Sequence, residues 1–142
     1  MMVVRIQATF DAADPQKLAA FWALALDYVL EPPPPEFDSW EQFADHHRIP
    51  REQWRAAVVD PDGRGPRLYF QPVPEGKTAK NRVHLDVQIG AGTSDPAERR
   101  RLVVQHVARL TQAGATRLRE QDDVFGYSIV MQDPEGNEFC IA

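Results

Sequence analysis

The sequence predicts an α+β fold built from two similar halves of one chain. Two stretches, Val3 to Phe10 and Arg82 to Ile89, alternate apolar and polar residues, which is the period of a strand with one buried face. Each stretch is followed by an Asp-Pro pair that favours the start of a helix, at Asp14-Pro15 and Asp95-Pro96. Each half then continues with strand-like runs around an Asp-Pro-acid-Gly turn. This shared order indicates an internal duplication.

In the first half, helical spacing of apolar residues predicts a helix from Pro15 to about Asp27, with the apolar positions Leu18, Phe21, Trp22 and Ala25. The run Pro32 to Pro35 ends any helix. Trp40 and Phe43 then indicate a short helix within an insertion over residues 37–55. Two strands, Ala56–Val59 and Arg67–Gln71, flank the turn that begins at Asp60.

In the second half, apolar positions at helical spacing predict a helix that ends near Gly114; they are Leu102, Val103, Val107 and Leu110. Three strands follow, at Thr116–Arg119, Tyr127–Gln132 and Glu138–Ile141. The last two are joined by the turn that begins at Asp133. We therefore expect one domain over residues 1–142, with module one at 1–72, a connector at 73–81 and module two at 82–142.

Composition excludes several classes of partner. The 142 residues carry a formal net charge of -5, so the electrostatic attraction to nucleic acid or to an anionic membrane is missing. Cys140 is the only cysteine, which rules out a disulfide within the chain. The opening run MMVVRIQATF is too short an apolar segment for a signal peptide or a membrane span. We expect a cytoplasmic protein.

Three segments of the chain resemble the vicinal oxygen chelate superfamily, and within it the glyoxalase-like domain proteins. The superfamily includes glyoxalases, extradiol dioxygenases and bleomycin-resistance-type binding proteins. The resemblance is carried by Asp14 to Trp22, by Lys80 to Val87 and by Asp133 to Cys140. It implies two βαβββ modules whose sheets curl into a half-barrel around a ligand cavity, with helices on the convex side. It also implies assembly into homodimers.

The strand faces opposite the apolar residues are polar, and we expect them to converge on the concave side. They carry Gln7 and Thr9, Tyr69 and Gln71, His84 and Asp86, and Glu138 and Cys140. Such a face is suited to a metal ion or a polar ligand, and the structural alternative is the solvated face of an open sheet. We place Thr9, Tyr69 and Glu138 in the substrate cavity, with Trp40 of the insertion as an aromatic wall.

The resemblance implies a divalent metal at corresponding positions of the two modules, which fall on Gln7, Gln71, His84 and Cys140. Gln71 and Cys140 depart from the family pattern, because carboxylates are usual there in glyoxalase I enzymes. The four side chains offer no fixed negative charge unless Cys140 ionises, whereas hard divalent ions are normally held by carboxylate oxygens. Glu138 or Asp86 can substitute. We therefore predict that the site can accept a divalent metal without requiring one, and we expect no other cofactor.

Two functions of different classes fit this reading. The first is a glyoxalase-like lyase or isomerase that acts on a small polar carbonyl-containing molecule, with His84 and Asp86 as the catalytic pair. Gln7 and Gln71 would orient the oxygen atoms of that molecule. The second is a non-catalytic, bleomycin-resistance-type protein that sequesters an aromatic small molecule or antibiotic. Fold alone does not choose between an enzyme and a binding protein.

Overall fold

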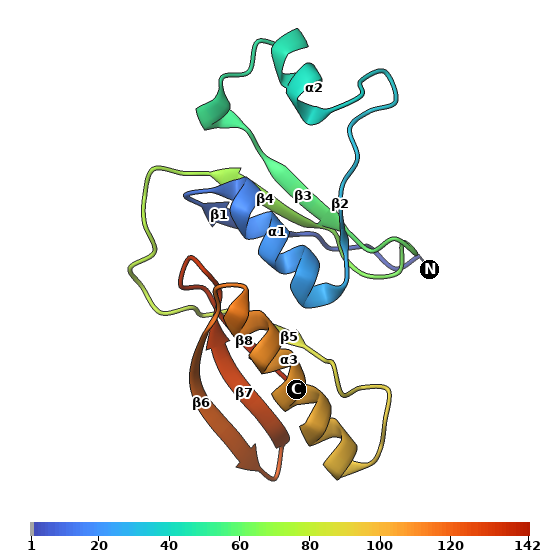
Figure 1. Ribbon diagram of the computed structural model, residues 1–142, viewed down its shortest axis with the longest axis vertical. Helices are drawn as coiled ribbons and strands as arrows, with labels where there is room; N and C mark the ends of the chain where they lie inside the picture. The colour runs from blue at the N-terminus through green and yellow to red at the C-terminus, as the bar shows by residue number, and fades with distance from the viewer. Residues whose placement is uncertain (1) are drawn as a thin grey trace. The chain divides into compact units, whose positions relative to one another are not determined.

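The structure is a computed structural model that describes residues 2–142. The chain divides into two compact units, Met1–Gly76 and Lys77–Ala142, and each is described by itself. Unit 1 and unit 2 each contain a four-stranded sheet with a long helix (Figure 1). No helix among residues 2–142 is long and apolar enough to cross a membrane.

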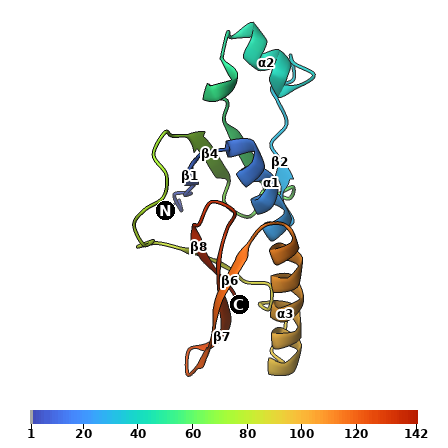
Figure 2. The ribbon, with the colours of Figure 1, turned by 60° about the vertical axis from the view of Figure 1, so that its left-hand side comes forward.

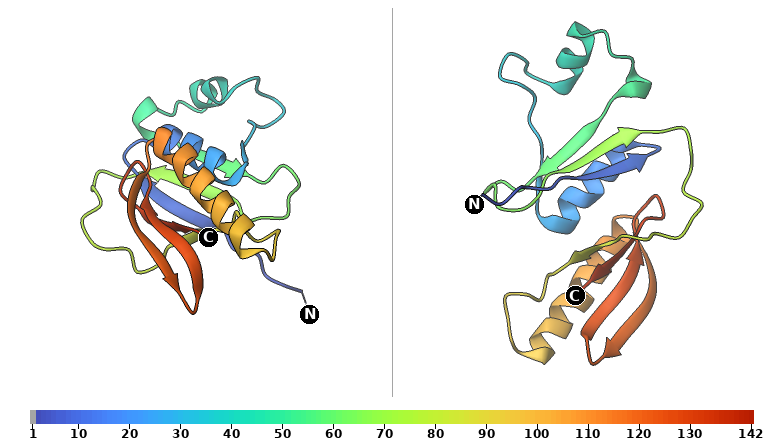
Figure 3. Two further views of the ribbon diagram at one scale, coloured as in Figure 1. Left: turned by 60° about the horizontal axis from the view of Figure 1, so that its bottom comes forward. Right: turned by 180° about the vertical axis from the view of Figure 1, so that it is seen from behind.

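Unit 1 is a βαβββ module with a helical insertion between its second and third strands. Its elements are β1 (Ala8–Ala12), α1 (Pro15–Leu26), β2 (Val29–Leu30), α2 (Trp40–His46), the 3-10 helix η1 (Arg51–Gln53), β3 (Ala56–Val59) and β4 (Leu68–Pro72). The strand order is β1-β4-β3-β2, with β1 parallel to β4 and the other pairs antiparallel. Helix α1 covers one face of this sheet, as the view from behind shows (Figure 3).

Helix α1 begins and ends where the sequence predicts. The Asp14 carboxylate accepts a hydrogen bond from the Lys17 backbone N–H at 3.1 Å, and Pro15 occupies the first turn. The helix ends at Asp27, whose φ of 53° is left-handed. Trp22 is 1% exposed and packs on Phe10 of β1, with 5.3 Å between the ring centroids. The apolar stripe of the helix therefore forms the core of unit 1.

Unit 2 repeats this order without the insertion. Its elements are β5 (Leu85–Val87), α3 (Pro96–Gln112), β6 (Thr116–Asp123), β7 (Gly126–Gln132) and β8 (Glu138–Ile141). The strand order β5-β8-β7-β6 matches that of unit 1, again with the first and last strands parallel. Two modules with one topology confirm the predicted α+β class and its two βαβββ modules.

Helix α3 lies along one face of the unit 2 sheet (Figure 2). The Asp95 carboxylate accepts from the Ala97 backbone N–H at 3.1 Å, and Pro96 follows in the first turn. Val103, Val107 and Leu110 are buried, in agreement with the predicted stripe. Leu102 lies outside the set of fully buried residues, and His106 takes a place in it.

The two Asp-Pro turns are built in the same way. Asp60 accepts hydrogen bonds from the backbone N–H groups of Asp62, Arg64 and Gly65, at 2.8, 3.1 and 2.8 Å. Asp133 accepts from the backbone N–H groups of Glu135 and Asn137, at 2.9 and 3.0 Å. Each turn contains a glycine with a left-handed φ, at Gly63 and Gly136. The repeated turn therefore has the same structural purpose in both modules.

The two opening strands are shorter than their alternation predicts. The pairing of β1 begins at Ala8 opposite Leu68, and the pairing of β5 begins at Leu85 opposite Phe139. Ile6 and Val83 belong to the apolar sides of the two predicted alternations, but both are 80% exposed. Alternation buries one face of a segment only where a neighbouring strand extends the sheet beside it. Within the described residues, the segments 2–7 and 82–84 have no such strand beside them.

Candidate functional site

The face of each sheet that turns away from its long helix is called the open face here. In unit 2 the helix side is identified by Arg100 of α3, which pairs with Glu120 at 3.3 Å and with Asp122 at 3.4 Å. Their odd-numbered neighbours on β6 therefore belong to the open face, because side chains alternate along a strand. The register places Asp86, Cys140 and Val130 side by side across β5, β8 and β7.

Three groups with metal-binding or acid–base chemistry meet on the open face of unit 2. His84 lies one residue before β5, Asp86 is within β5, and Cys140 is within β8. One ligand atom from each of them lies within 4.8 Å of the others. The Nδ1 atom of His84 is 3.3 Å from Oδ1 of Asp86. The imidazole and the thiol therefore share one carboxylate.

The Cys140 thiol is held in its protonated form. Burial raises the pKa of this thiol, and the charge of the neighbouring Asp86 carboxylate adds to the rise. The positive charge of Arg119 acts in the opposite direction, whereas a hydrogen bond to Asp86 raises the pKa further. Because an ordinary thiol is already mostly protonated at neutral pH, Cys140 is a neutral group there and not a thiolate nucleophile.

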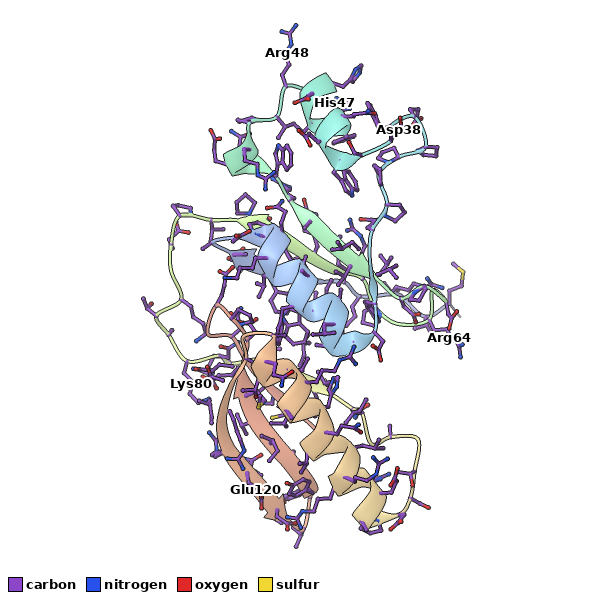
Figure 4. The ribbon with its side chains drawn as sticks, in the orientation of Figure 1. Asp38, His47, Arg48, Arg64, Lys80 and Glu120 are labelled. Carbon is purple, nitrogen blue, oxygen red and sulfur yellow. The ribbon has the colours of Figure 1, made fainter. Side chains whose placement is uncertain are left out.

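A small hollow opens beside this cluster, with a volume of about 70 Å³. Its lining residues all belong to unit 2: Lys80, His84, Arg119, Gln121, Val130, Glu138, Phe139 and Cys140. Figure 4 labels Lys80, in the segment before β5, and Glu120, on β6. The ammonium of Lys80 lies 2.7 Å from the Glu138 carboxylate. This hydrogen bond lowers the pKa of Glu138, which is therefore an anion at neutral pH.

The open face of unit 1 is cross-linked by its own polar side chains. Arg67 donates from Nη1 to Oε1 of Gln7 at 2.8 Å, and it also pairs with Glu31. Gln71 donates from Nε2 to Oδ1 of Asp11, also at 2.8 Å. These bonds hold both glutamines in fixed positions.

The predicted cavity residues Thr9 and Tyr69 also lie on this face, directly opposite each other in the register of β1 and β4. The Tyr69 hydroxyl accepts a hydrogen bond from Arg55 at 2.8 Å. Arg55, the residue directly before β3, therefore holds the Tyr69 hydroxyl in place.

The strand register also shows which positions of the two units correspond. Ala57 and Val130 each lie three residues before their turn aspartate. Ala57 pairs with Tyr69, and Val130 pairs with Cys140. The counterpart of Cys140 in unit 1 is therefore Tyr69, whereas the sequence suggested Gln71. The loop after the first turn is longer than the loop after the second turn. The two-residue offset between Gln71 and Tyr69 is therefore not evident from the sequence.

Trp40, the predicted aromatic wall, lies in the insertion of unit 1. Its indole N–H donates to the Glu31 backbone carbonyl at 2.7 Å, and its ring is 5.3 Å from that of Phe43. Phe37 contacts Phe43 in turn, so the insertion has a small aromatic cluster of its own. His47 and Arg48, labelled in Figure 4, mark the end of α2. Trp40 remains 42% exposed.

Comparison with known proteins decides the family. The model of the glyoxalase-like domain matches residues 7–142 of the chain. The chain belongs to the glyoxalase-like domain family. A search of curated proteins finds no match.

Solved structures show the same fold for this glyoxalase-like protein. The fosfomycin resistance protein FosX from Mesorhizobium loti is 14% identical with a TM-score of 0.64, over 99% of this chain and 91% of that one. A glyoxalase/bleomycin resistance protein/dioxygenase family enzyme from Burkholderia phytofirmans is 16% identical with a TM-score of 0.62, over 95% and 94%. A mutant of FosX from Listeria monocytogenes, complexed with Mn(II) and a dihydroxypropylphosphonic acid, is 15% identical with a TM-score of 0.63, over 99% and 90%.

Within unit 2, the structure brings together two of the four predicted metal ligands. His84 and Cys140 meet in unit 2, with Asp86 between them. Gln7 and Gln71 lie on the open face of unit 1, where Arg67 already bonds the Gln7 oxygen that would face an ion. That the four residues share one cavity stays a prediction. Within unit 2, an imidazole, a carboxylate and a thiol form a mixed donor set that suits a borderline ion such as Zn²⁺.

Three residues of the open faces were missed by the sequence reasoning. Asp11 and Arg67 continue the alternations of their strands, so the period of two could have found both. Arg119 could not be found in that way. An irregularity in β6 sets its register, and the sequence gives no sign of it.

Proposed function

We propose that this glyoxalase-like protein binds a small polar carbonyl-containing molecule on the open face of unit 2 and moves a proton on it, as a lyase or isomerase. The observation that supports this proposal is the pairing of His84 Nδ1 with Asp86 Oδ1 at 3.3 Å, beside a hollow lined by polar groups. His84 acts as the general base, and Asp86 positions it.

The geometry suits proton transfer because each nitrogen of the ring has its own task. A carboxylate beside Nδ1 keeps the ring hydrogen on that side, which leaves Nε2 available to accept a proton. A carbon next to a carbonyl group is the natural proton donor, because the carbonyl oxygen takes up the developing charge.

A divalent ion is compatible with the same cluster, and we propose His84, Asp86 and Cys140 as the residues that would hold it. When bound, such an ion would polarise the carbonyl oxygen as a Lewis acid. Zn²⁺ alone is the probe, measured by calorimetric titration. Asp86→Asn should remove binding. The matched control is Glu120→Gln, which changes a carboxylate on the helix side of the same sheet. Equal Zn²⁺ affinity in both variants contradicts the metal assignment.

The proposed proton transfer is tested by hydrogen exchange in D₂O. The protein is incubated with hydroxyacetone, dihydroxyacetone, glyceraldehyde and pyruvate, and NMR follows the loss of hydrogen from carbons next to the carbonyl. We expect exchange on at least one compound, and background rates in His84→Gln. His46→Gln, a change of an exposed histidine on α2, should keep the wild-type rate. Repeating the assay with EDTA separates a metal-assisted reaction from a metal-independent one. No exchange above background on any compound contradicts the proposal.

The alternative function, sequestration of an aromatic molecule without catalysis, is favoured by one observation. Trp40 is fixed by its hydrogen bond to Glu31 and by its contact with Phe43, yet 42% of it is exposed. A rigid, exposed indole is suited to stacking on an aromatic ligand. Bleomycin itself is a suitable probe. Tight binding that is lost in Trp40→Ala, together with no hydrogen exchange in the D₂O assay, would favour this function over the first.

We also propose that the chain forms a homodimer in the cytoplasm. All eight residues of the edge strand β6 are exposed, and an exposed sheet edge is open to pairing with a second copy. A lone cysteine that forms no disulfide is at home in a reducing compartment. Sedimentation tests the dimer, and a single species of 16.1 kDa at micromolar concentration contradicts it.

A further inference from the structure

Arg119 owes its position to a break in the strand register of β6. Arg117 lies opposite Met131, and Arg119 lies opposite Val130, so Leu118 is an extra residue between them. In a regular strand, residues two apart share a face. Here the two arginines lie opposite consecutive residues of β7, and the irregularity divides them between the two faces. Arg119 joins the row of Val130 and Cys140 and lines the hollow.

The other charged groups around the hollow contact one another or His84, and not Arg119. Lys80 and Glu138 form an ion pair at 2.7 Å, and the Asp86 carboxylate contacts the His84 ring at 3.3 Å. Arg117, on the other face, lies 3.9 Å from Glu120. Within residues 2–142, the side chain of Arg119 makes no hydrogen bond and no ion pair. All five N–H donors of its guanidinium are therefore available to a ligand in the hollow.

The size of the hollow limits what such a ligand can be. A volume of about 70 Å³ holds several water molecules, since one needs about 10–15 Å³. That space suits a compact group of a few atoms. A guanidinium binds planar or tetrahedral oxyanions with two parallel hydrogen bonds, which gives both affinity and orientation.

We propose that Arg119 binds an oxyanion group, a carboxylate or a phosphate, on the carbonyl compound that this site takes. The inference rests on the proposed function, because it names the substrate class of the same site. Arg119 then fixes one end of the molecule in the hollow, while His84 faces the carbon that loses its proton. The substrate class is an oxo acid or a phosphorylated carbonyl compound, and its neutral analogues bind weakly.

Two matched pairs of probes test this inference. Pyruvate is compared with hydroxyacetone, and dihydroxyacetone phosphate with dihydroxyacetone, by calorimetric titration of the full-length protein. The anionic member of at least one pair should bind more tightly than its neutral partner. Arg119→Gln should lower the affinity for that anion about 10- to 100-fold and leave the affinity for the neutral partner unchanged. Arg119→Lys, which keeps the charge but not the paired donors, should lie between. The pair that responds shows whether the group is a carboxylate or a phosphate.

The control is Arg117→Gln, which removes an arginine from the other face of the same strand. It should bind the anionic and neutral members of both pairs with wild-type affinity. Three results overturn the inference. They are an equal loss of anion affinity in Arg117→Gln and Arg119→Gln, wild-type binding of an anion that is no tighter than that of its neutral partner in both pairs, and unchanged anion affinity in Arg119→Gln. The D₂O assay keeps the two proposals apart. Exchange that is indifferent to Arg119 supports the proton transfer and removes the anion site. Anion binding through Arg119 without any exchange supports the anion site and removes the proton transfer.

Discussion

The open faces of the two units share one arrangement of strands, but their side chains differ in chemistry. In unit 1, the row across the sheet is Thr9, Tyr69 and Ala57; in unit 2, the corresponding row is Asp86, Cys140 and Val130. The polar groups of unit 1 bond largely to one another, through Arg67 to Gln7 and through Gln71 to Asp11. In unit 2, a histidine, a carboxylate and a thiol cluster beside a hollow that a cation lines.

This difference shows how a duplicated module can divide its work. The buried side of each sheet must keep its apolar residues, because each helix packs there. The open side is under no such constraint and can change one residue at a time. Unit 1 has filled its open side with mutually satisfied amides and arginines, which favour a fixed shape. Unit 2 has kept groups whose hydrogen-bonding capacity is incomplete, and these are the groups that suit chemistry.

The largest expected effect tests the side that the two units share. Phe70 of β4 is fully buried in unit 1, and Phe139 of β8 is 1% exposed in unit 2. Replacing either by alanine should lower the free energy of unfolding by about 3–5 kcal/mol, because each change leaves a cavity in a core. Urea denaturation measures both variants. A loss in one variant only would show that the two cores are not equivalent.

A second comparison concerns the two turns. Asp133 is 3% exposed, and its carboxylate accepts hydrogen bonds from the backbone N–H groups of Glu135 and Asn137 and from the Asn137 side chain. Asp133→Ala should cost about 3 kcal/mol, because buried donors lose a charged partner. Asp60→Ala should cost less, since its turn is more open to water. Thermal unfolding of the two variants side by side provides the test, and a larger loss for Asp60→Ala would contradict the ranking.

Much of the fold could be predicted because its signals are local. Asp14 and Asp95 precede prolines and cap their helices, and the strands β3 and β8 have the bounds that the strand-like runs beside the two turns predict. The site was harder to predict. His84 and Asp86 share a face by spacing alone, but the approach of Cys140 depends on the pairing of β5 with β8. Register and bulges are properties of two strands, and a single strand does not reveal them.

The smallest expected effect is a pH dependence of stability that arises from one carboxylate, Asp60 in the first turn. Hydrogen bonds from the backbone N–H groups of Gly65 and Asp62 lower the pKa of Asp60 below its ordinary value of 3.8. A lowered pKa in the folded state stabilises the protein above the ordinary value, and this contribution is lost as the pH falls towards the folded-state value. Asp60→Asn should therefore unfold at a lower temperature than the wild type at neutral pH. The difference should shrink below about pH 4. A difference that grows in acid contradicts this cause.

The central claim is that the chemistry resides on the open face of unit 2. The most direct test makes one change, aspartate to asparagine, on each open face and measures hydrogen exchange in D₂O on the best compound of the panel. Asp86→Asn should lower the exchange rate about 100-fold or more, because His84 loses the carboxylate that positions it. Asp11→Asn, which changes the carboxylate beside Gln71, should stay within about threefold of the wild type. An Asp86→Asn protein that is folded and exchanges at the wild-type rate, or an equal loss in Asp11→Asn, would contradict the account.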